Sequence, residues 1–239
     1  WRLQLQKPQF TSLADARVAI WDDSPLAPVA DDIRARLSEV GDELSTRGAT
    51  VSYNARPDFS EEEALYSYVT MIYAGFSTGH QDEDAHRGRT SELEATIPSG
   101  DRYYEALLAG HTIPHWEYGR VVRSQTAIRA AWDAFFRDWD VLLMPAFATL
   151  SVPHDHRLMP ERRVVLSGRE MAYKQQIFWV GLPTFANLPS TALPLGLSSG
   201  GLPIGCQAVG NAFNDLKTIE FARLYAQDLG GFSPPPGFG

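Results

Sequence analysis

The sequence is short of three features that would set it apart from ordinary globular proteins. Its single cysteine, Cys206, makes an intrachain disulfide impossible and fits a reducing compartment, which predicts a cytoplasmic protein. It has no run of about 18 apolar residues and no basic-then-apolar start, so we expect neither a membrane span nor a signal peptide. It also has no Lys/Arg cluster, and 21 basic against 29 acidic residues give a net charge of -8. That balance disfavours nucleic acid and anionic membranes as partners, and leaves a small neutral substrate compatible.

What is present is enough apolar sequence for a sizeable core. The chain has 239 residues, of which 44% are hydrophobic, and it contains no internal repeat and no linker between domains. Residues 1–239 are therefore expected to belong to a single domain. The chain opens at Trp1 rather than at Met, which predicts a segment of something longer.

The first part of the chain has the pattern of a βαβ unit. After a lead-in over residues 1–15, residues 16–53 read as a strand, an amphipathic helix over Val29–Arg47 that ends at Gly48, and a second strand. Short connections make parallel pairing with a right-handed crossover the expected arrangement.

The middle of the chain is predicted to be largely helical. A helix over Phe59–Gly79 begins at Ser60, which is followed by three glutamates, and residues 81–102 read as an irregular, lid-like loop. The remaining predicted elements are helices over Tyr103–Ala109, Tyr118–Trp139, Glu170–Val180 and Asp215–Leu229, strands over Asp140–Met144 and Val164–Leu166, and a tail over residues 230–239.

Residues 187–210 predict a core hairpin. Two apolar runs, Thr191–Leu197 and Leu202–Val209, flank a Ser-Ser-Gly-Gly connection, which indicates two buried strands at the centre of a sheet. A catalytic serine would need an activating base and oxyanion donors. Because Ser198 and Ser199 lie between two strands without a neighbouring Lys or His, the turn interpretation is favoured over a nucleophile.

Histidines and aromatic residues offer two further candidates. His154 and His156 raise the alternative of a metal hydrolase, which predicts loss of activity on chelation, but their spacing matches no established zinc motif. Phe178 and Trp179 lie where a helix meets the hairpin, and Phe147 follows a strand end. Pockets in α/β sheets form outside strand carboxyl ends, so these aromatics are either pocket-lining residues or plain core.

Several motifs together resemble the C-terminal half of the amidase-signature hydrolases. They are Trp1–Leu3 with Leu13–Trp21, Trp139–Pro145, and Asn187–Pro189 through Leu193–Gly196 to Gly201–Gly210, followed by Phe213 and the helix to Leu229. The resemblance implies an α/β fold with a large mixed, mostly buried sheet covered by helices, incomplete in this chain. It also implies hydrolysis of carboxamide C–N bonds without a cofactor or a metal.

The resemblance leaves the covalent chemistry outside this sequence. The family uses a serine nucleophile, a bridging serine in a cis peptide and a lysine base, which belong to an upstream lysine and an upstream Gly-Gly-Ser-Ser-Gly-Gly-Ser signature. This sequence has neither, and Ser198, Ser199 and Lys174 do not match those contexts, so no catalytic residue is assigned here. The family's C-terminal half lines part of the pocket, which makes the following residues substrate-contact candidates: Phe147, Phe178, Trp179 and Leu182.

The leading hypothesis is therefore the C-terminal segment of a serine amidase, inactive by itself and packed against a missing N-terminal half. The acidic balance and the Pro-Pro-Pro ending favour free-standing amidases of small-molecule amides, carbamates, anilides or esters over the family's subunit that amidates charged transfer RNA. A homodimer is compatible with this hypothesis. The rival hypothesis is a non-catalytic binding or scaffold subunit that keeps the fold without an active site.

Overall fold

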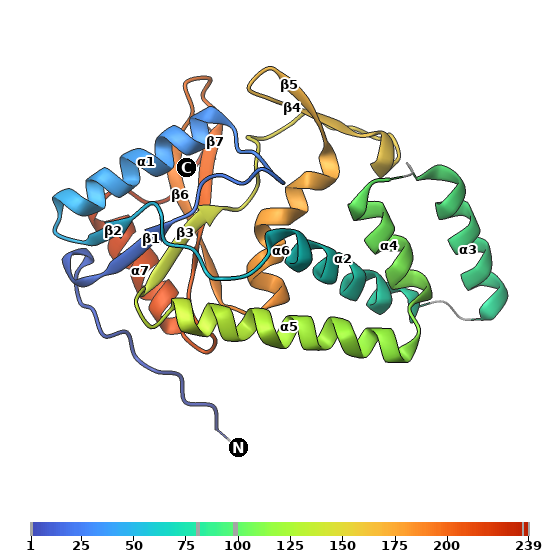
Figure 1. Cartoon of the computed structure of the whole chain (residues 1–239). Helices are drawn as coiled ribbons and strands as arrows, with labels where there is room; N and C mark the ends of the chain where they lie inside the picture. Colours follow the sequence, from blue (N-terminus) through green and yellow to red (C-terminus); the bar gives the residue numbers. More distant parts are fainter. Residues whose placement is uncertain (1, 80–81, 98–99, 236, 239) are drawn as a thin grey trace.

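The computed structural model describes residues 2–79, 82–97, 100–235 and 237–238 (Figure 1). Its strands are β1 (Arg17–Ile20), β2 (Thr50–Ser52), β3 (Val141–Pro145), β4 (Arg163–Leu166), β5 (Arg169–Ala172), β6 (Ser190–Leu197) and β7 (Pro203–Val209). Its α-helices are α1 (Asp31–Thr46), α2 (Glu61–Ser77), α3 (Glu83–Thr96), α4 (Arg102–Thr112), α5 (His115–Phe135), α6 (Ile177–Phe185) and α7 (Asp215–Asp228). Short 3-10 turns are η1 (Leu13–Asp15), η2 (Met159–Glu161) and η3 (Tyr173–Gln176). Within this described part of the chain, no helix combines the length and apolarity needed to cross a membrane.

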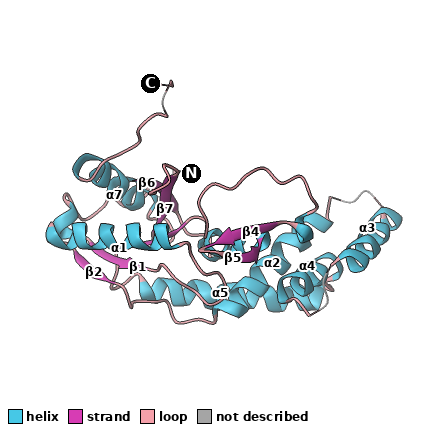
Figure 2. Cartoon of the chain, turned by 90° about the horizontal axis from the view of Figure 1, so that it is seen from above, coloured by secondary structure: helices cyan, strands magenta, loops and turns pink. Residues whose placement is uncertain are grey.

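A five-stranded mixed sheet in the order β2-β1-β3-β7-β6 forms the centre of the fold. β1 pairs in parallel with β2, as the βαβ pattern predicts, and also in parallel with β3. β7 runs antiparallel to both β3 and β6. Figure 2 shows α7 and α5 on opposite sides of the strands, and Figure 1 shows α2, α3 and α4 extending beyond one end of the sheet.

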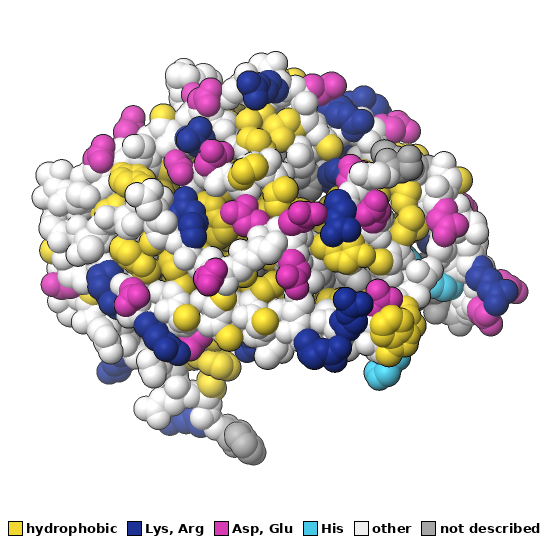
Figure 3. Space-filling view, viewed as in Figure 1, with side chains coloured by type: hydrophobic (Ala, Val, Ile, Leu, Met, Phe, Trp, Pro, Cys, Tyr) yellow, Lys and Arg dark blue, Asp and Glu magenta, His cyan; other side chains and the backbone are white. Residues whose placement is uncertain are grey.

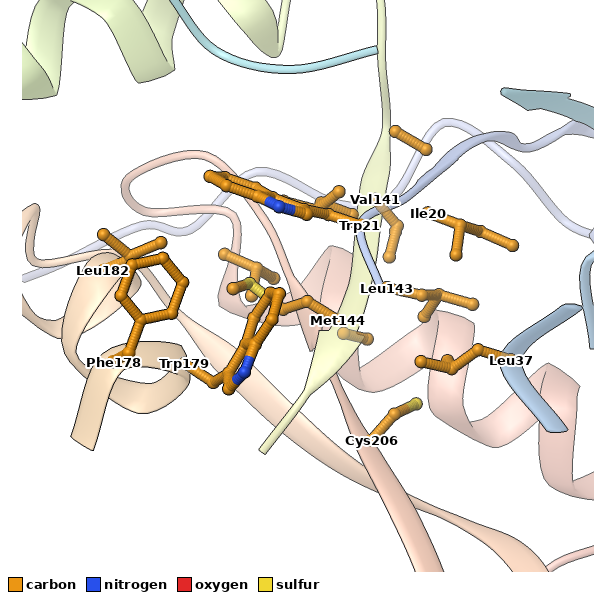
Figure 4. Close-up of a cluster of buried hydrophobic side chains, with 14 of the residues drawn as sticks. Ile20, Trp21, Leu37, Val141, Leu143, Met144, Phe178, Trp179, Leu182 and Cys206 are labelled. Atoms are coloured by element: carbon orange, nitrogen blue, oxygen red, sulfur yellow. The ribbon is translucent and has the colours of Figure 1, made fainter. Parts of the chain in front are cut away.

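Alternating side chains give the sheet two buried faces. Ile20 and Leu143 point toward Leu37 of α1, whereas Trp21 points to the opposite face, toward Trp179 of α6 (Figure 4). On that second face the Trp21 ring meets the Trp179 ring edge-on, with centroids 6.0 Å apart, and lies 6.4 Å from the Trp132 ring of α5. The aromatic residues of this face fasten α5 and α6 to the sheet.

The hairpin differs from its predicted place at the sheet centre. β7 is an inner strand, but β6 forms an edge of the sheet among the described strands. Within β6, Leu193 and Leu195 are buried and most other side chains are exposed. A register shift lies between Pro194 and Gly196, and the Nε atom of Arg36 donates a hydrogen bond of 2.7 Å to the carbonyl of Leu195. An apolar run indicates that the side chains of a strand are buried, but it does not indicate whether the strand has a hydrogen-bonded neighbour on each side.

The predicted irregular loop over residues 81–102 is wrong for most of its length. Residues 81, 98 and 99 lie outside the described residues, but Glu83–Thr96 forms α3. The Asp82 side chain caps this helix by accepting a 2.7 Å hydrogen bond from the backbone N–H of Ala85, and an ion pair joins Glu83 to Arg87. Because α3 is polar around most of its surface, its sequence has no apolar period from which to recognise it.

The predicted helix over Glu170–Val180 begins too early. Residues Arg169–Ala172 form β5, which pairs antiparallel with β4, and α6 starts only at Ile177. The turn between the strands has positive φ angles at Ser167 (48°) and Gly168 (80°). Two successive left-handed residues produce a tight hairpin, and the single Gly gave too weak a signal to distinguish it from a helix start.

A buried carboxylate ties the beginnings of β1 and β3 to α7. Asp140 accepts hydrogen bonds from the backbone N and the Nε of Arg17, both at 3.0 Å, and from the Nζ of Lys217 at 3.1 Å. Burial acts to raise the pKa of Asp140, but the hydrogen bonds from Arg17 and Lys217 outweigh it and hold that pKa below its usual value.

Replacing Asp140 with asparagine is expected to lower the free energy of unfolding by about 2 kcal/mol near pH 7, because two cations lose their charged acceptor. Because the pKa of Asp140 is lower in the folded than in the unfolded protein, its ionised carboxylate stabilises the fold at pH values above the ordinary Asp pKa of about 3.9. This stabilisation is lost as the pH falls through the pKa of the folded state. Urea unfolding between pH 7 and pH 3 measures the difference between variant and parent. Asp138→Asn, at an exposed neighbouring position, is the control; an equal loss at both pH values would contradict the role assigned to the charge.

Candidate functional site

A cavity of about 510 Å³ opens where the chain leaves β3 and enters β7. It lies beside the first turn of α1, at the carboxyl end of β3, which is where α/β sheets place their ligands. Its lining consists of Ile33, Ala146, Phe147, Thr149, Leu150, Ser151, Val152, Tyr173, Gln176, Ala192, Leu193, Pro194, Pro203, Ile204, Gly205, Cys206 and Phe232. Among these described residues there is no Asp, Glu, Lys or Arg, so the cavity favours an uncharged ligand.

A buried glutamine fixes the end of β3. The Nε2 of Gln207, on β7, donates hydrogen bonds of 2.9 Å to the carbonyls of both Pro145 and Trp179, and its Oε1 accepts one of 2.8 Å from the hydroxyl of Ser190. One side-chain amide thus joins β3, α6 and β6, and it is itself only 6% exposed. The point where the chain turns from the sheet into the cavity wall is therefore rigidly placed.

A second glutamine holds the loop that follows. Gln176 of η3 accepts a 2.8 Å hydrogen bond from the backbone N–H of Ala148 and donates one of 2.6 Å to the hydroxyl of Thr149. Phe147 therefore lies between two anchored points, at Pro145 and at Ala148. Its ring borders the cavity and remains 51% exposed.

The four predicted substrate contacts divide into two groups. Phe147 borders the cavity, whereas Phe178, Trp179 and Leu182 are at most 2% exposed and pack in the core (Figure 4). The indole N–H of Trp179 donates a 3.0 Å hydrogen bond to the carbonyl of Ala27. In this chain these three residues hold α6 against the sheet, and residue type alone could not separate that role from pocket lining.

The sequence interpretation did not single out Gln176 and Gln207. A signal existed for Gln207, because it is a polar residue inside the apolar run Leu202–Val209 and a buried amide requires hydrogen-bond partners. For Gln176 the sequence carries no such signal, since its surroundings read as a helix.

Cys206 borders the cavity but is not set up as a nucleophile. Burial raises the pKa of its thiol to about 12, so the reactive thiolate is almost absent at neutral pH. The side chain acts as a small apolar group on the α1 face of β7 (Figure 4).

The Ser-Ser-Gly-Gly connection behaves as a turn. The hydroxyl of Ser198 accepts a 3.1 Å hydrogen bond from the backbone N–H of Leu202, and Gly201 has a φ of 77°. Lys174, the lysine weighed as a base, instead forms an ion pair with Asp101 and lies 4.3 Å from the ring centroid of Tyr104. Burial lowers the pKa of Lys174 despite that ion pair.

His154 and His156 lie on either side of Asp155, whose carboxylate is already engaged. The rings of His154 and His156 lie 6.3 Å apart, and Asp155 between them is bound by Arg157, whose hydrogen bonds hold the pKa of the carboxyl at about 2. Across the residues with described positions, no group of three or more His, Cys, Asp or Glu side chains gathers to hold a metal ion. The described residues therefore give the metal-hydrolase alternative no set of metal ligands.

The chain is similar in sequence to part of several glutamyl-tRNA(Gln) amidotransferase subunits. A glutamyl-tRNA(Gln) amidotransferase subunit of Synechococcus sp. (strain CC9605) is 26% identical over 229 residues, covering 86% of this chain and 43% of the relative. The corresponding subunit of Lachnospira eligens is 30% identical over 172 residues, covering 70% and 32%. The chain therefore spans less than half the length of these curated relatives.

Several solved structures have the same fold as this chain over part of their length. A bacterial aryl acylamidase of the amidase signature enzymes superposes with a TM-score of 0.66 at 20% identity, over 92% of this chain and 44% of that one. The glutamyl-tRNA(Gln) amidotransferase subunit of Thermotoga maritima gives 0.62 at 18% identity, over 98% and 49%. The family model described as Amidase matches residues 3–219, so this chain belongs to the amidase family, as its amidase-signature motifs predicted.

Proposed function

We propose that the complete protein hydrolyses the C–N bond of a small, uncharged amide, and that this chain supplies sheet strands and one wall of the substrate pocket. The observation that carries the proposal is the uncharged cavity at the end of β3, built on a chain of the amidase family. Carbamates, anilides and small esters present a similar carbonyl and remain within the proposal; in an ester the bond broken is the acyl C–O bond, and the leaving group is an alcohol.

The covalent chemistry is proposed to come from a portion of the protein outside this chain. Cys206 borders the cavity, but burial raises the pKa of its thiol. The hydroxyl of Ser198 accepts a hydrogen bond from the backbone N–H of Leu202 within the hairpin turn. Lys174 is engaged by Asp101, so these three groups do not form a nucleophile with its base. The serine, bridging serine and lysine of the family are accordingly assigned to an N-terminal half that packs against this chain, with β6 and its open edge as part of the contact.

A small neutral substrate is preferred over charged transfer RNA as the target. The relatives named above are amidotransferase subunits, but this chain carries a net charge of -8. On the face shown in Figure 3, basic side chains are interspersed with acidic ones, an arrangement that does little to attract a polyanion. A cytoplasmic location and a homodimer are retained as parts of this proposal.

The test uses the full-length protein with a serine-directed fluorophosphonate probe and a neutral primary amide. We expect covalent labelling, hydrolysis, and an increase of about tenfold in KM with little change in kcat for Phe147→Ala, because a wall contact is lost. Phe213→Ala, at an exposed position away from the cavity, is the matched control.

Two results would overturn the proposal. Hydrolysis by residues 1–239 alone that Ser198→Ala or Ser199→Ala abolishes would place the nucleophile in this chain. A full-length protein that neither reacts with the probe nor hydrolyses any amide would favour the rival, a binding or scaffold subunit.

A further inference from the structure

The chain returns to the candidate site after its last helix. α7 ends at Asp228, and four residues later Phe232 borders the same cavity as Phe147. Gly230, with a φ of 109°, permits the turn, and Gly231 passes so near Ala226 that an added Cβ would lie 3.2 Å from the alanine Cβ. The tail is thus directed across the end of α7 toward the cavity.

We propose that Phe232 is a specificity-determining residue, whose ring receives the aromatic group of an uncharged aryl amide together with Phe147. This inference rests on the proposed amidase function and names its substrate class. Phe147 and Phe232 reach the cavity from elements far apart in the sequence, the β3 exit loop and the C-terminal tail.

The exposure of the Phe147 and Phe232 rings leaves them free to contact a ligand. Phe232 is 79% exposed and Phe147 51% exposed, so both rings have free surface beside the cavity. A phenyl ring gains from contact with another ring beyond the area that it buries, because edge and face carry opposite partial charges. An unbranched alkyl chain of similar size makes no such contact.

The rest of the lining points to the same class of ligand. Its uncharged polar groups are those of Thr149, Ser151, Tyr173 and Gln176, and Gln176 already uses its amide on the β3 exit loop. Aliphatic side chains such as Ile33 and Ile204 complete the surface. A charged acyl or leaving group would lose its hydration here without gaining a counter-ion from these residues.

The tail contains its own control. Phe238 is 82% exposed, lies six positions further along, and does not border the cavity. A general effect of removing an exposed phenylalanine from the tail would therefore appear equally in Phe232→Ala and Phe238→Ala.

The experiment measures kcat and KM of the full-length protein for benzamide and for hexanamide, two neutral primary amides that differ in the aromatic ring. For Phe232→Ala we expect KM for benzamide to rise about tenfold, KM for hexanamide to change less than about threefold, and kcat to stay nearly constant. Phe238→Ala should match the parent, and Phe232→Tyr should restore the low KM for benzamide. Because Phe232 is exposed, the unfolding midpoint should be the same in all variants, which checks their folding.

The outcomes separate the two proposals. If the parent turns over both amides and Phe232→Ala changes neither KM, or changes both equally, the role of Phe232 is refuted and the amidase function stands. If the parent turns over neither amide and reacts with no serine-directed probe, the amidase function fails and the role of Phe232 fails with it.

Discussion

Replacing Gln207 with leucine is expected to lower the free energy of unfolding by about 4 kcal/mol, the largest loss that we predict for a single side chain. The leucine fills a similar volume but leaves the carbonyls of Pro145 and Trp179 and the hydroxyl of Ser190 without the amide that satisfies them. Buried polar groups without partners lose their hydration uncompensated. Urea unfolding, followed by circular dichroism, measures the loss.

Two comparisons show whether hydrogen bonding is the cause. Gln227→Leu, on the exposed surface of α7, should change stability by less than about 0.5 kcal/mol. Gln207→Glu keeps the shape but replaces the donor with an acceptor opposite two carbonyl oxygens, so it too should destabilise strongly. If Gln207→Glu were as stable as the parent, the amide donor would not be what holds β3 to α6.

Gly110→Ala is expected to destabilise the protein by about 3 kcal/mol, because α2 and α4 approach too closely at this position to admit a methyl group. An added Cβ would lie 2.5 Å from the carbonyl oxygen of Thr70, 2.8 Å from the Cβ of Tyr73 and 3.0 Å from the backbone N of Ala74. Backbone atoms of α2 cannot move aside as a flexible side chain would. The helices must therefore separate, with loss of the packing between them.

Gly75→Ala supplies the matched control, since Gly75 is also inside a helix but an added Cβ there meets nothing within 4 Å. That variant should gain about 0.5–1 kcal/mol, because alanine has less conformational freedom to lose on folding. Opposite signs in thermal or urea unfolding are the expected result. Destabilisation of the same size at both positions would mean that the loss at Gly110 does not come from its close contact with α2, and would contradict the prediction.

The elements that the sequence predicted correctly are those encoded by local chemistry. Ser60 before three glutamates indicated a helix start, and its hydroxyl accepts a 3.2 Å hydrogen bond from the backbone N–H of Glu63. The apolar period of Val29–Arg47 and the paired runs of residues 187–210 likewise correspond to α1 and to the β6–β7 hairpin. In each case neighbouring residues contain the whole signal.

The candidate site was predicted only in part. A strand end followed by Phe147 was enough to expect a pocket residue, and Phe147 does border the cavity. Trp179 has the same aromatic character but turns into the core, and Phe232 reaches the cavity from a tail without regular structure. Which aromatic ring meets open space depends on how distant elements pack, so no local pattern distinguishes them.

By itself, then, the sequence determined the family, the βαβ start, the hairpin and the absence of the family's signature lysine and serine motif from these residues. The tertiary structure decided that β6 forms an edge of the described sheet, that Gln176 and Gln207 hold the β3 exit loop, and that Phe147 and Phe232 share one cavity. The physical reason is the range of the interactions. Caps, turns and apolar periods act between residues a few positions apart, whereas the cavity is made by segments that meet only after the sheet has formed.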